Sequence, residues 1–179
     1  MLSKKNKTIY IALIFMITLN LMLSSCKKQP TYKGEAPIGI EFSADIYAKY
    51  DGMDIEAKLN RSYIGMLTLE VLQPDTIAGT SMVWDGRDIT ISYGGMSFVV
   101  NGSEFPQAAL GTAIISVLDD AVSLAPNLGE LTDAGRVISG ENDHGSYTLI
   151  SDPDTGNLIS LEIPERKLSV RFDNFQIKK

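Results

Sequence analysis

Few residues in this chain are of the types that do acid–base or nucleophilic chemistry. Its 179 residues include one cysteine, Cys26, and one histidine, His144. A zinc site takes several Cys or His ligands, and a nucleophilic triad needs a histidine beside the nucleophile. His144 lies in the polar stretch 141–145, which is typical of a surface turn. We therefore expect no catalytic residue, no metal and no cofactor, and we do not expect an enzyme.

Three sets of carboxylates are candidates for chemistry. Asp119 and Asp120 are adjacent on an expected helix and would point about 100° apart, whereas Asp85 and Asp88 flank an expected turn. All four are expected to be solvated. Residues 152–157 begin like a calcium loop, but an isoleucine stands where an EF-hand needs its twelfth-position glutamate. A hairpin turn accounts for that loop.

Cys26 ends a segment with the features of an export signal. The segment has lysines at positions 4, 5 and 7, then an apolar run over residues 9–23, then Ser24-Ser25-Cys26. A basic start, a short apolar run and small residues at the cut are typical of a secretory signal. The run is shorter than the roughly 20 apolar residues of a spanning helix.

Leu23-Ser24-Ser25-Cys26 resembles the lipobox of bacterial lipoproteins. The resemblance implies removal of residues 1–25 and a thioether-linked diacylglycerol on Cys26, and two acyl chains anchor a protein stably. The alternatives are a plain signal peptide with an incidental cysteine, or an uncleaved anchor. Residues 26–34 are polar and contain a proline, and we expect them to form a tether.

The charge of the chain bears on its partners and location. The formal net charge is −6, and three of the basic residues precede Cys26, so the remainder is more acidic still. An acidic surface argues against nucleic acid as a partner. The expected location is extracytoplasmic, on the outer face of the cell membrane or on an outer membrane. The expected partners are that membrane, through Cys26, a lipid or lipoprotein acyl chain, and an envelope protein.

Residues 38–50 carry the clearest structural signal, because apolar and polar side chains alternate through the whole segment. That period of two is typical of a strand with one buried and one solvated face. Asp51-Gly52 is typical of a tight hairpin turn, and Asn60-Arg61-Ser62 of another turn. Further strands are expected over residues 53–60, 63–72, 81–84, 87–93, 96–100, 136–140, 146–151, 158–163 and 167–177.

One helix is expected in mid-chain, over residues 107–124 and opened by Pro106. It is apolar nearly all round, which predicts burial. Residues 125–133 are expected to form a loop or a short helical turn. The predicted fold class is α+β and mostly β: a curved antiparallel sheet, an incomplete barrel, closed by one central apolar helix. Residues 35–179 are expected to form this single domain.

Residues 67–93 resemble the lipoprotein-carrier superfamily, the LolA and LolB proteins and their Gram-positive lipoprotein relatives. The matching residues are Leu67-Thr68-Leu69-Glu70-Val71, Gln73-Pro74-Asp75, Trp84-Asp85-Gly86-Arg87 and residues 89–93. The resemblance implies an incomplete barrel whose open side is plugged by helices, with acyl chains bound between sheet and helix and no catalytic group. This chain has a lipobox, as LolB has, but one strong helix where the carriers have several.

The apolar face of the sheet is either a packed core or the lining of a cavity for a lipid-like ligand. The candidate lining residues are Ile40, Phe42, Ile46, Ile55, Leu67, Leu69, Ile114 and Leu118. Trp84, beside a turn, and Ile77, in the loop of residues 73–79, are candidate rim contacts; otherwise Trp84 is partly buried and Ile77 folds back onto the core.

The two readings differ in what the interior should contain. A continuous cavity of about 300 Å³ or more would favour a ligand. A filled interior would favour the alternative, an envelope protein-interaction or structural lipoprotein without a ligand.

Overall fold

The computed structural model describes residues 36–101, 109–123 and 129–178. Cys26 lies outside the described residues, as do the predicted signal peptide and the predicted tether. Pro106, which was predicted to open the helix, also lies outside them. In the part of the chain that is described, no helix combines the length and hydropathy needed to cross a bilayer. In chain order the elements are β1 (Phe42–Tyr50), β2 (Met53–Tyr63), β3 (Met66–Gln73), β4 (Ser81–Asp85), β5 (Asp88–Tyr93), β6 (Met96–Asn101), α2 (Ala109–Ser123), β7 (Glu130–Thr132), β8 (Gly135–Asn142), β9 (Gly145–Ser151), β10 (Leu158–Ile163), the 3₁₀ turn η2 (Pro164–Arg166) and β11 (Leu168–Ile177).

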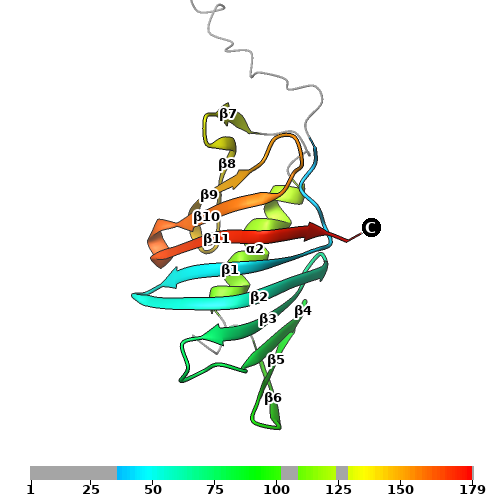
Figure 1. Ribbon diagram of the computed structural model, residues 1–179, viewed down its shortest axis with the longest axis vertical. Helices are drawn as coiled ribbons and strands as arrows, with labels where there is room; N and C mark the ends of the chain where they lie inside the picture. The colour runs from blue at the N-terminus through cyan, green and yellow to red at the C-terminus, as the bar shows by residue number, and fades with distance from the viewer. Residues whose placement is uncertain (1–35, 102–108, 124–128, 179) are drawn as a thin grey trace, which may run out of the picture. The chain divides into compact units, whose positions relative to one another are not determined.

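The strands form one antiparallel sheet of eleven strands, in the order β6-β5-β4-β3-β2-β1-β11-β10-β9-β8-β7 (Figure 1). Strands β1–β6 make a first meander and β7–β11 a second, because each strand pairs with the next along the chain. The two meanders meet where β1 pairs with β11, and α2 lies between them in sequence. The predicted mostly β fold, an open antiparallel sheet with a helix, is confirmed.

Each central strand has one buried and one solvated face, as the alternation predicted. In β1, Phe42, Ala44, Ile46 and Ala48 are buried, while the residues between them are partly or fully exposed. The turn at Asp51-Gly52 has positive φ at both residues (46° and 86°), the backbone that a two-residue hairpin requires. The buried faces of neighbouring strands therefore coincide and form one apolar inner surface.

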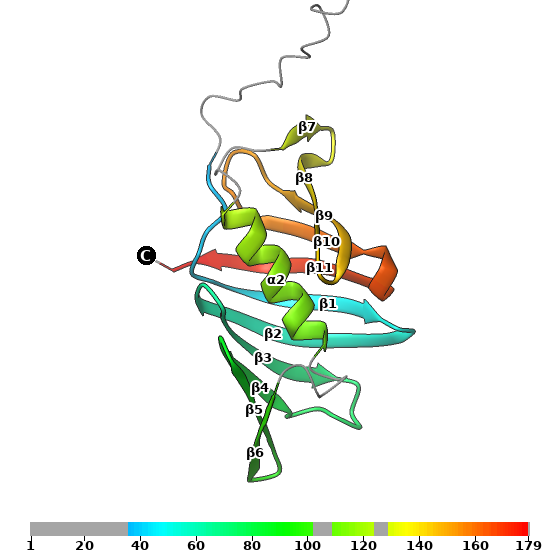
Figure 2. The ribbon, with the colours of Figure 1, turned by 180° about the vertical axis from the view of Figure 1, so that it is seen from behind.

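Helix α2 covers this inner surface (Figure 2). It packs against β3 in the first meander and against β8 and β9 in the second. Its residues Ile114, Val117 and Leu118 are fully buried, so α2 forms the second layer of the core, as its apolar composition predicted.

Several details differ from the sequence-based expectations. Strand β1 begins at Phe42 rather than at residue 38, because the last residue of β11, Ile177, pairs with Phe42 and β11 continues no further. Ile40 therefore precedes the strand and is 40% exposed, so its placement on the buried face was wrong. Strand β7 forms within residues 125–133, which were expected to lack a strand. Arg61 lies inside β2 rather than in a turn.

Residues from Tyr32 to Lys179 form one compact unit. Every core residue described belongs to this unit, from Ile38 to Phe172. Because a domain with its own hydrophobic core can in principle fold alone, we expect the unit 32–179 to fold independently of residues 1–31.

Candidate ligand-binding pocket

An apolar pocket of about 510 Å³ lies between the first meander and the first turn of α2. Its walls come from the β1–β2 hairpin, β3, the loop after β3, β4, β5 and α2. The lining residues are Tyr50, Asp51, Met53, Ile55, Leu69, Val71, Ile77, Thr80, Met82, Ile91, Tyr93 and Leu110. Most are hydrophobic, with few polar groups, which is the usual make-up of a small-molecule site.

Strand register builds the floor of this pocket. Leu69 of β3 pairs with Met82 of β4, Met82 with Ile91 of β5, and Ile91 with Phe98 of β6. Paired residues share one face of a sheet, so these four side chains form a row across the inner surface. The exposed fraction is 1% at Leu69, 9% at Met82 and 8% at Ile91, and it reaches 50% at Phe98. The row thus runs from the core to open solvent.

The mouth of the pocket lies at the end of the sheet that carries the β1–β2, β3–β4 and β5–β6 turns. Met53 and Tyr93 flank it from the first and third of these turns, and they are 48% and 46% exposed. Ile77 in the β3–β4 loop is half-buried, packs against the core and also lines the pocket. An apolar molecule entering here would meet apolar side chains from three turns.

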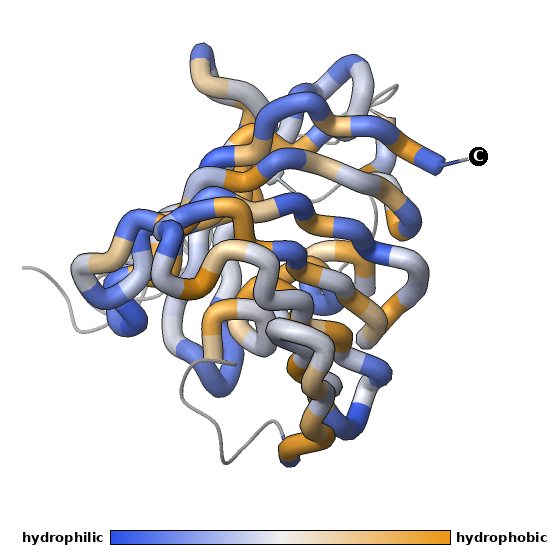
Figure 3. Tube along the Cα trace, turned by 60° about the horizontal axis from the view of Figure 1, so that its bottom comes forward, coloured by the Kyte–Doolittle hydropathy of each residue, from blue (hydrophilic) through white to orange (hydrophobic). Residues whose placement is uncertain are grey.

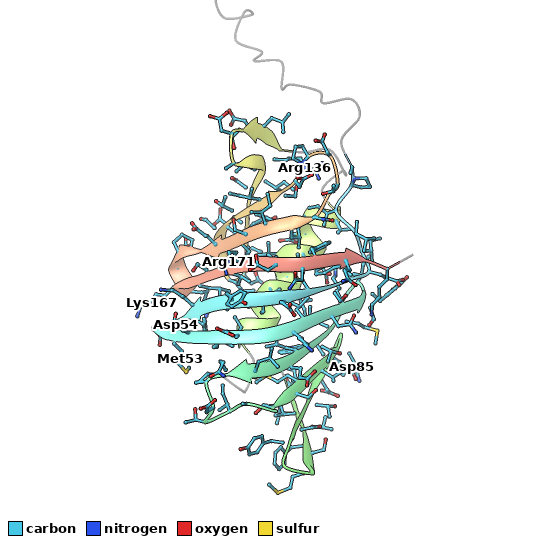
Figure 4. All side chains as sticks on the ribbon, viewed as in Figure 1. Met53, Asp54, Asp85, Arg136, Lys167 and Arg171 are labelled. Carbon is cyan, nitrogen blue, oxygen red and sulfur yellow. The ribbon has the colours of Figure 1, made fainter. Side chains whose placement is uncertain are left out.

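One ion pair stands at this mouth. Lys167 Nζ, in the turn before β11, donates a hydrogen bond to Asp51 Oδ1 at 2.8 Å, and Asp51 lines the pocket. This bond lowers the pKa of Asp51 and raises the pKa of Lys167. Both groups are therefore charged at neutral pH. Figure 4 shows Met53 and Lys167 at the same end of the sheet, so a polar group of a bound ligand could face this pair while its apolar part lies inside.

The structure divides the predicted lining residues into three groups, of which the first is the exposed Ile40. Ile55 and Leu69 line the pocket, and so does Ile77, which was predicted as a loop contact. Their contact with a ligand stays a prediction. The remaining five lie in the packed core, exposed by 1% or less: Phe42, Ile46, Leu67, Ile114 and Leu118.

Trp84 does not lie at a rim, and that expectation was wrong. Its side chain points inward from β4 and is only 5% exposed. Its indole Nε1 donates a hydrogen bond to Thr112 Oγ1 of α2 at 3.2 Å. A Cβ on Gly111 would lie 2.1 Å from the indole, so only glycine lets the helix approach this ring. The neighbouring turn suggested exposure, but Trp84 shares the inward side of β4 with Met82.

An ion pair that the sequence-based prediction missed ties α2 to the sheet. Arg61 is 1% exposed, and its Nη2 donates to Oδ1 of Asp119, whose Oδ2 accepts the backbone N–H of Gly65 at 3.0 Å. Burial lowers the pKa of Arg61, and Asp119 opposes that shift. The expectation of a solvated Asp119 was therefore wrong. The available signal was that Arg61 continues the inward positions of Ala57 and Leu59.

Asp85 and Asp152 have structural roles in turns. Asp85 Oδ1 accepts the backbone N–H groups of Arg87 and Asp88, which lowers its pKa. Asp152 Oδ1 accepts the backbone N–H of Thr155 at 2.8 Å and its hydroxyl at 2.8 Å, with the same effect on pKa. Within the described ranges, no group of three or more His, Cys, Asp or Glu side chains could hold a metal ion.

Comparisons with known proteins give fold-level likeness only. No family model matches the chain, and no curated protein matches its sequence. Among solved structures, an uncharacterized conserved protein from Thermus thermophilus matches with a TM-score of 0.48 and 9% identity, over 79% of this chain and 80% of that one. A DUF1329 family protein from Desulfovibrio piger matches with a TM-score of 0.41 and 10% identity, over 78% and 86%.

A LolA superfamily protein from Nitrosomonas europaea matches with a TM-score of 0.36 and 8% identity, over 80% of this chain and 87% of that one. At these TM-scores and identities the three matches establish neither family membership nor a shared ligand. The fold assignment rests on this chain's own strand order and helix.

Proposed function

We propose that this chain binds an apolar, lipid-like ligand in the pocket between the first meander and α2, without acting on it chemically. The observation that carries the proposal is the pocket itself. Its volume of about 510 Å³ exceeds the roughly 300 Å³ above which a ligand site is favoured over a packed core. Its lining consists mainly of hydrophobic side chains.

The shape of the lining favours an elongated ligand. The row Leu69–Met82–Ile91 runs along the floor and leads to the half-exposed Phe98. Methionine adapts to irregular shapes, and Met53 and Met82 both line the site. An acyl chain fits such a floor, and its polar end would face the Asp51–Lys167 pair at the mouth.

We further propose that the protein works at a membrane surface, held there by lipid on Cys26. The lipobox-like Leu23-Ser24-Ser25-Cys26 supports this anchor. Metabolic labelling of growing cells with an alkyne fatty acid should label the full chain, and Cys26→Ser should remove the label. Equal labelling of both would contradict the anchor and leave the pocket unaffected.

The ligand is tested on the unit 32–179 with a fluorescent fatty acid as the probe. Wild-type protein should bind it saturably, and Met82→Trp should weaken binding at least tenfold because the larger side chain fills the pocket floor. Met66→Trp, the same change at a methionine 41% exposed and outside the lining, should bind like wild type. An absence of saturable binding, or equal loss in both variants, would contradict the proposal and favour a structural or interaction lipoprotein.

A further inference from the structure

The free end of the first meander is an unusual sheet edge. Strand β6 pairs with β5 without a register shift, and in the described part of the chain nothing pairs with its other side. Met96, Phe98 and Val99 are 59%, 50% and 67% exposed. Figure 3, which brings this end forward, shows hydrophobic segments gathered there. The strand presents apolar side chains on both faces and, from Met96 to Val100, an open row of backbone groups.

Charge separates this edge from the rest of the domain. From Ile89 to Ser103 the sequence contains no charged residue and no proline, although the chain carries a net charge of −6. Natural sheets guard their edges with charges, prolines, bulges or very short strands. The opposite edge has such a guard, because β7 has three residues and begins with Glu130. Strand β6 has six residues and none of these guards.

We propose that two copies of this chain associate by antiparallel pairing of their β6 strands, extending both sheets into one. An antiparallel pair of identical strands has a two-fold axis, the commonest symmetry of soluble oligomers. Two acidic copies repel each other over most of their surface, whereas the segment 89–101 can approach itself without placing like charges together. This pairing would satisfy the open backbone groups from Met96 to Val100 and cover part of the Phe98 and Val99 side chains.

The dimer also bears on the pocket, although it does not depend on a ligand. Phe98 ends the row that begins at Leu69 and lies on the open side of the pocket floor. In the paired sheet, the Phe98 side chain of the second copy would continue this row. Each copy would thereby contribute apolar surface beside the pocket of the other.

Sedimentation equilibrium of the unit 32–179 tests the association. We expect a concentration-dependent dimer. Val99→Lys should weaken it at least tenfold, because each copy then carries a lysine beside the paired edge and the two charges repel. Val83→Lys is the matched control: Val83 lies on the same face, two strands inward, and is 37% exposed. This control should leave the dimer unchanged, and circular dichroism should show both variants folded.

Cysteine crosslinking tests the geometry, since the unit 32–179 contains no cysteine of its own. Under mild oxidation, Phe98→Cys, which faces Phe98 of the second copy in this register, should form disulfide-linked dimers much faster than Glu130→Cys at the opposite edge. A monomer at 200 μM would overturn the proposal, as would a dimer insensitive to Val99→Lys or equal crosslinking at both edges. A monomer that binds phosphatidylcholine vesicles through Phe98 and Val99 would overturn it in favour of a lipid surface.

Discussion

The two meanders share one sheet but differ in how they are covered. In the second, Leu149, Leu161 and Ile163 have no exposed surface beneath α2. In the first, the inner row starts at the buried Leu69 and ends at the half-exposed Phe98. The same alternation thus builds a solid core on one side and a pocket on the other. The position of α2 determines which side is filled. It packs against two strands of the second meander, β8 and β9, but in the first meander its main contact is β3.

The largest expected effect tests what holds α2 over both meanders. Asp119→Ala leaves the buried Arg61 charge without its partner, and we expect a loss of about 3 kcal/mol in the free energy of unfolding. Urea unfolding of the unit 32–179 measures it. Asp120→Ala, the neighbouring acid outside the pair, should cost less than about 0.5 kcal/mol. Equal costs for the two would contradict the role given to the ion pair.

Truncations compare the packed and the open side directly. Leu161→Ala in the second meander should cost about 3 kcal/mol, because it leaves a cavity in close-packed surroundings. Ile91→Ala in the first meander should cost about 1.5 kcal/mol, since its side chain already borders the pocket and loses fewer contacts. Both are read from chemical denaturation, and equal costs would mean that the first meander is as tightly packed as the second.

Gly111 tests the contact between α2 and the first meander. Gly111→Ala should cost about 2 kcal/mol, because the new Cβ overlaps the Trp84 indole. The fluorescence of Trp84, the single tryptophan, should shift to the red as the ring becomes exposed. In a Trp84→Phe background, which lacks the overlapping ring atoms, the same change should cost less than about 1 kcal/mol. A full cost in both backgrounds would show that the indole does not set the helix position.

The smallest effect concerns His144, at the β8–β9 turn of the second meander. Burial, with a smaller contribution from Arg166, lowers its pKa below the usual 6.5. The unfolded chain therefore takes up this proton at a higher pH than the folded chain, so stability falls as the pH drops through 6.5 toward the lowered pKa of the folded state. We expect a decrease in Tm of about 1 °C for this partly exposed group. His144→Gln should remove that component, and an unchanged pH dependence would contradict it.

Most of the fold could be predicted from the sequence because it depends on local patterns. The alternation in β1 and β2, the turn at Asp51-Gly52 and the apolar mid-chain segment each indicate their element without tertiary information. Strand β7 was missed because its three residues have no pattern of their own and are defined by pairing with β8. Ile40 was misplaced because the length of β11, a partner distant in sequence, sets the start of β1.

The site was less predictable than the fold. The sequence shows which side chains face inward, and Ile55 and Leu69 were identified on that basis. It does not show where α2 lies, and this position separates pocket residues such as Ile55 from core residues such as Ile46. The Arg61–Asp119 pair was missed for a related reason, since it joins a strand and a helix that no local pattern connects.

The central claim is that a lipid-like molecule binds at the open side of the first meander, and methyl NMR of the unit 32–179 during a dodecanoate titration tests it most directly. Ile55, Ile77 and Ile91 line the pocket, whereas Ile138 and Ile163 are buried in the second meander. We predict saturable shifts at the first three residues and little change at the other two. Shifts centred on Ile138 and Ile163, or no saturable shift at all, would contradict the account.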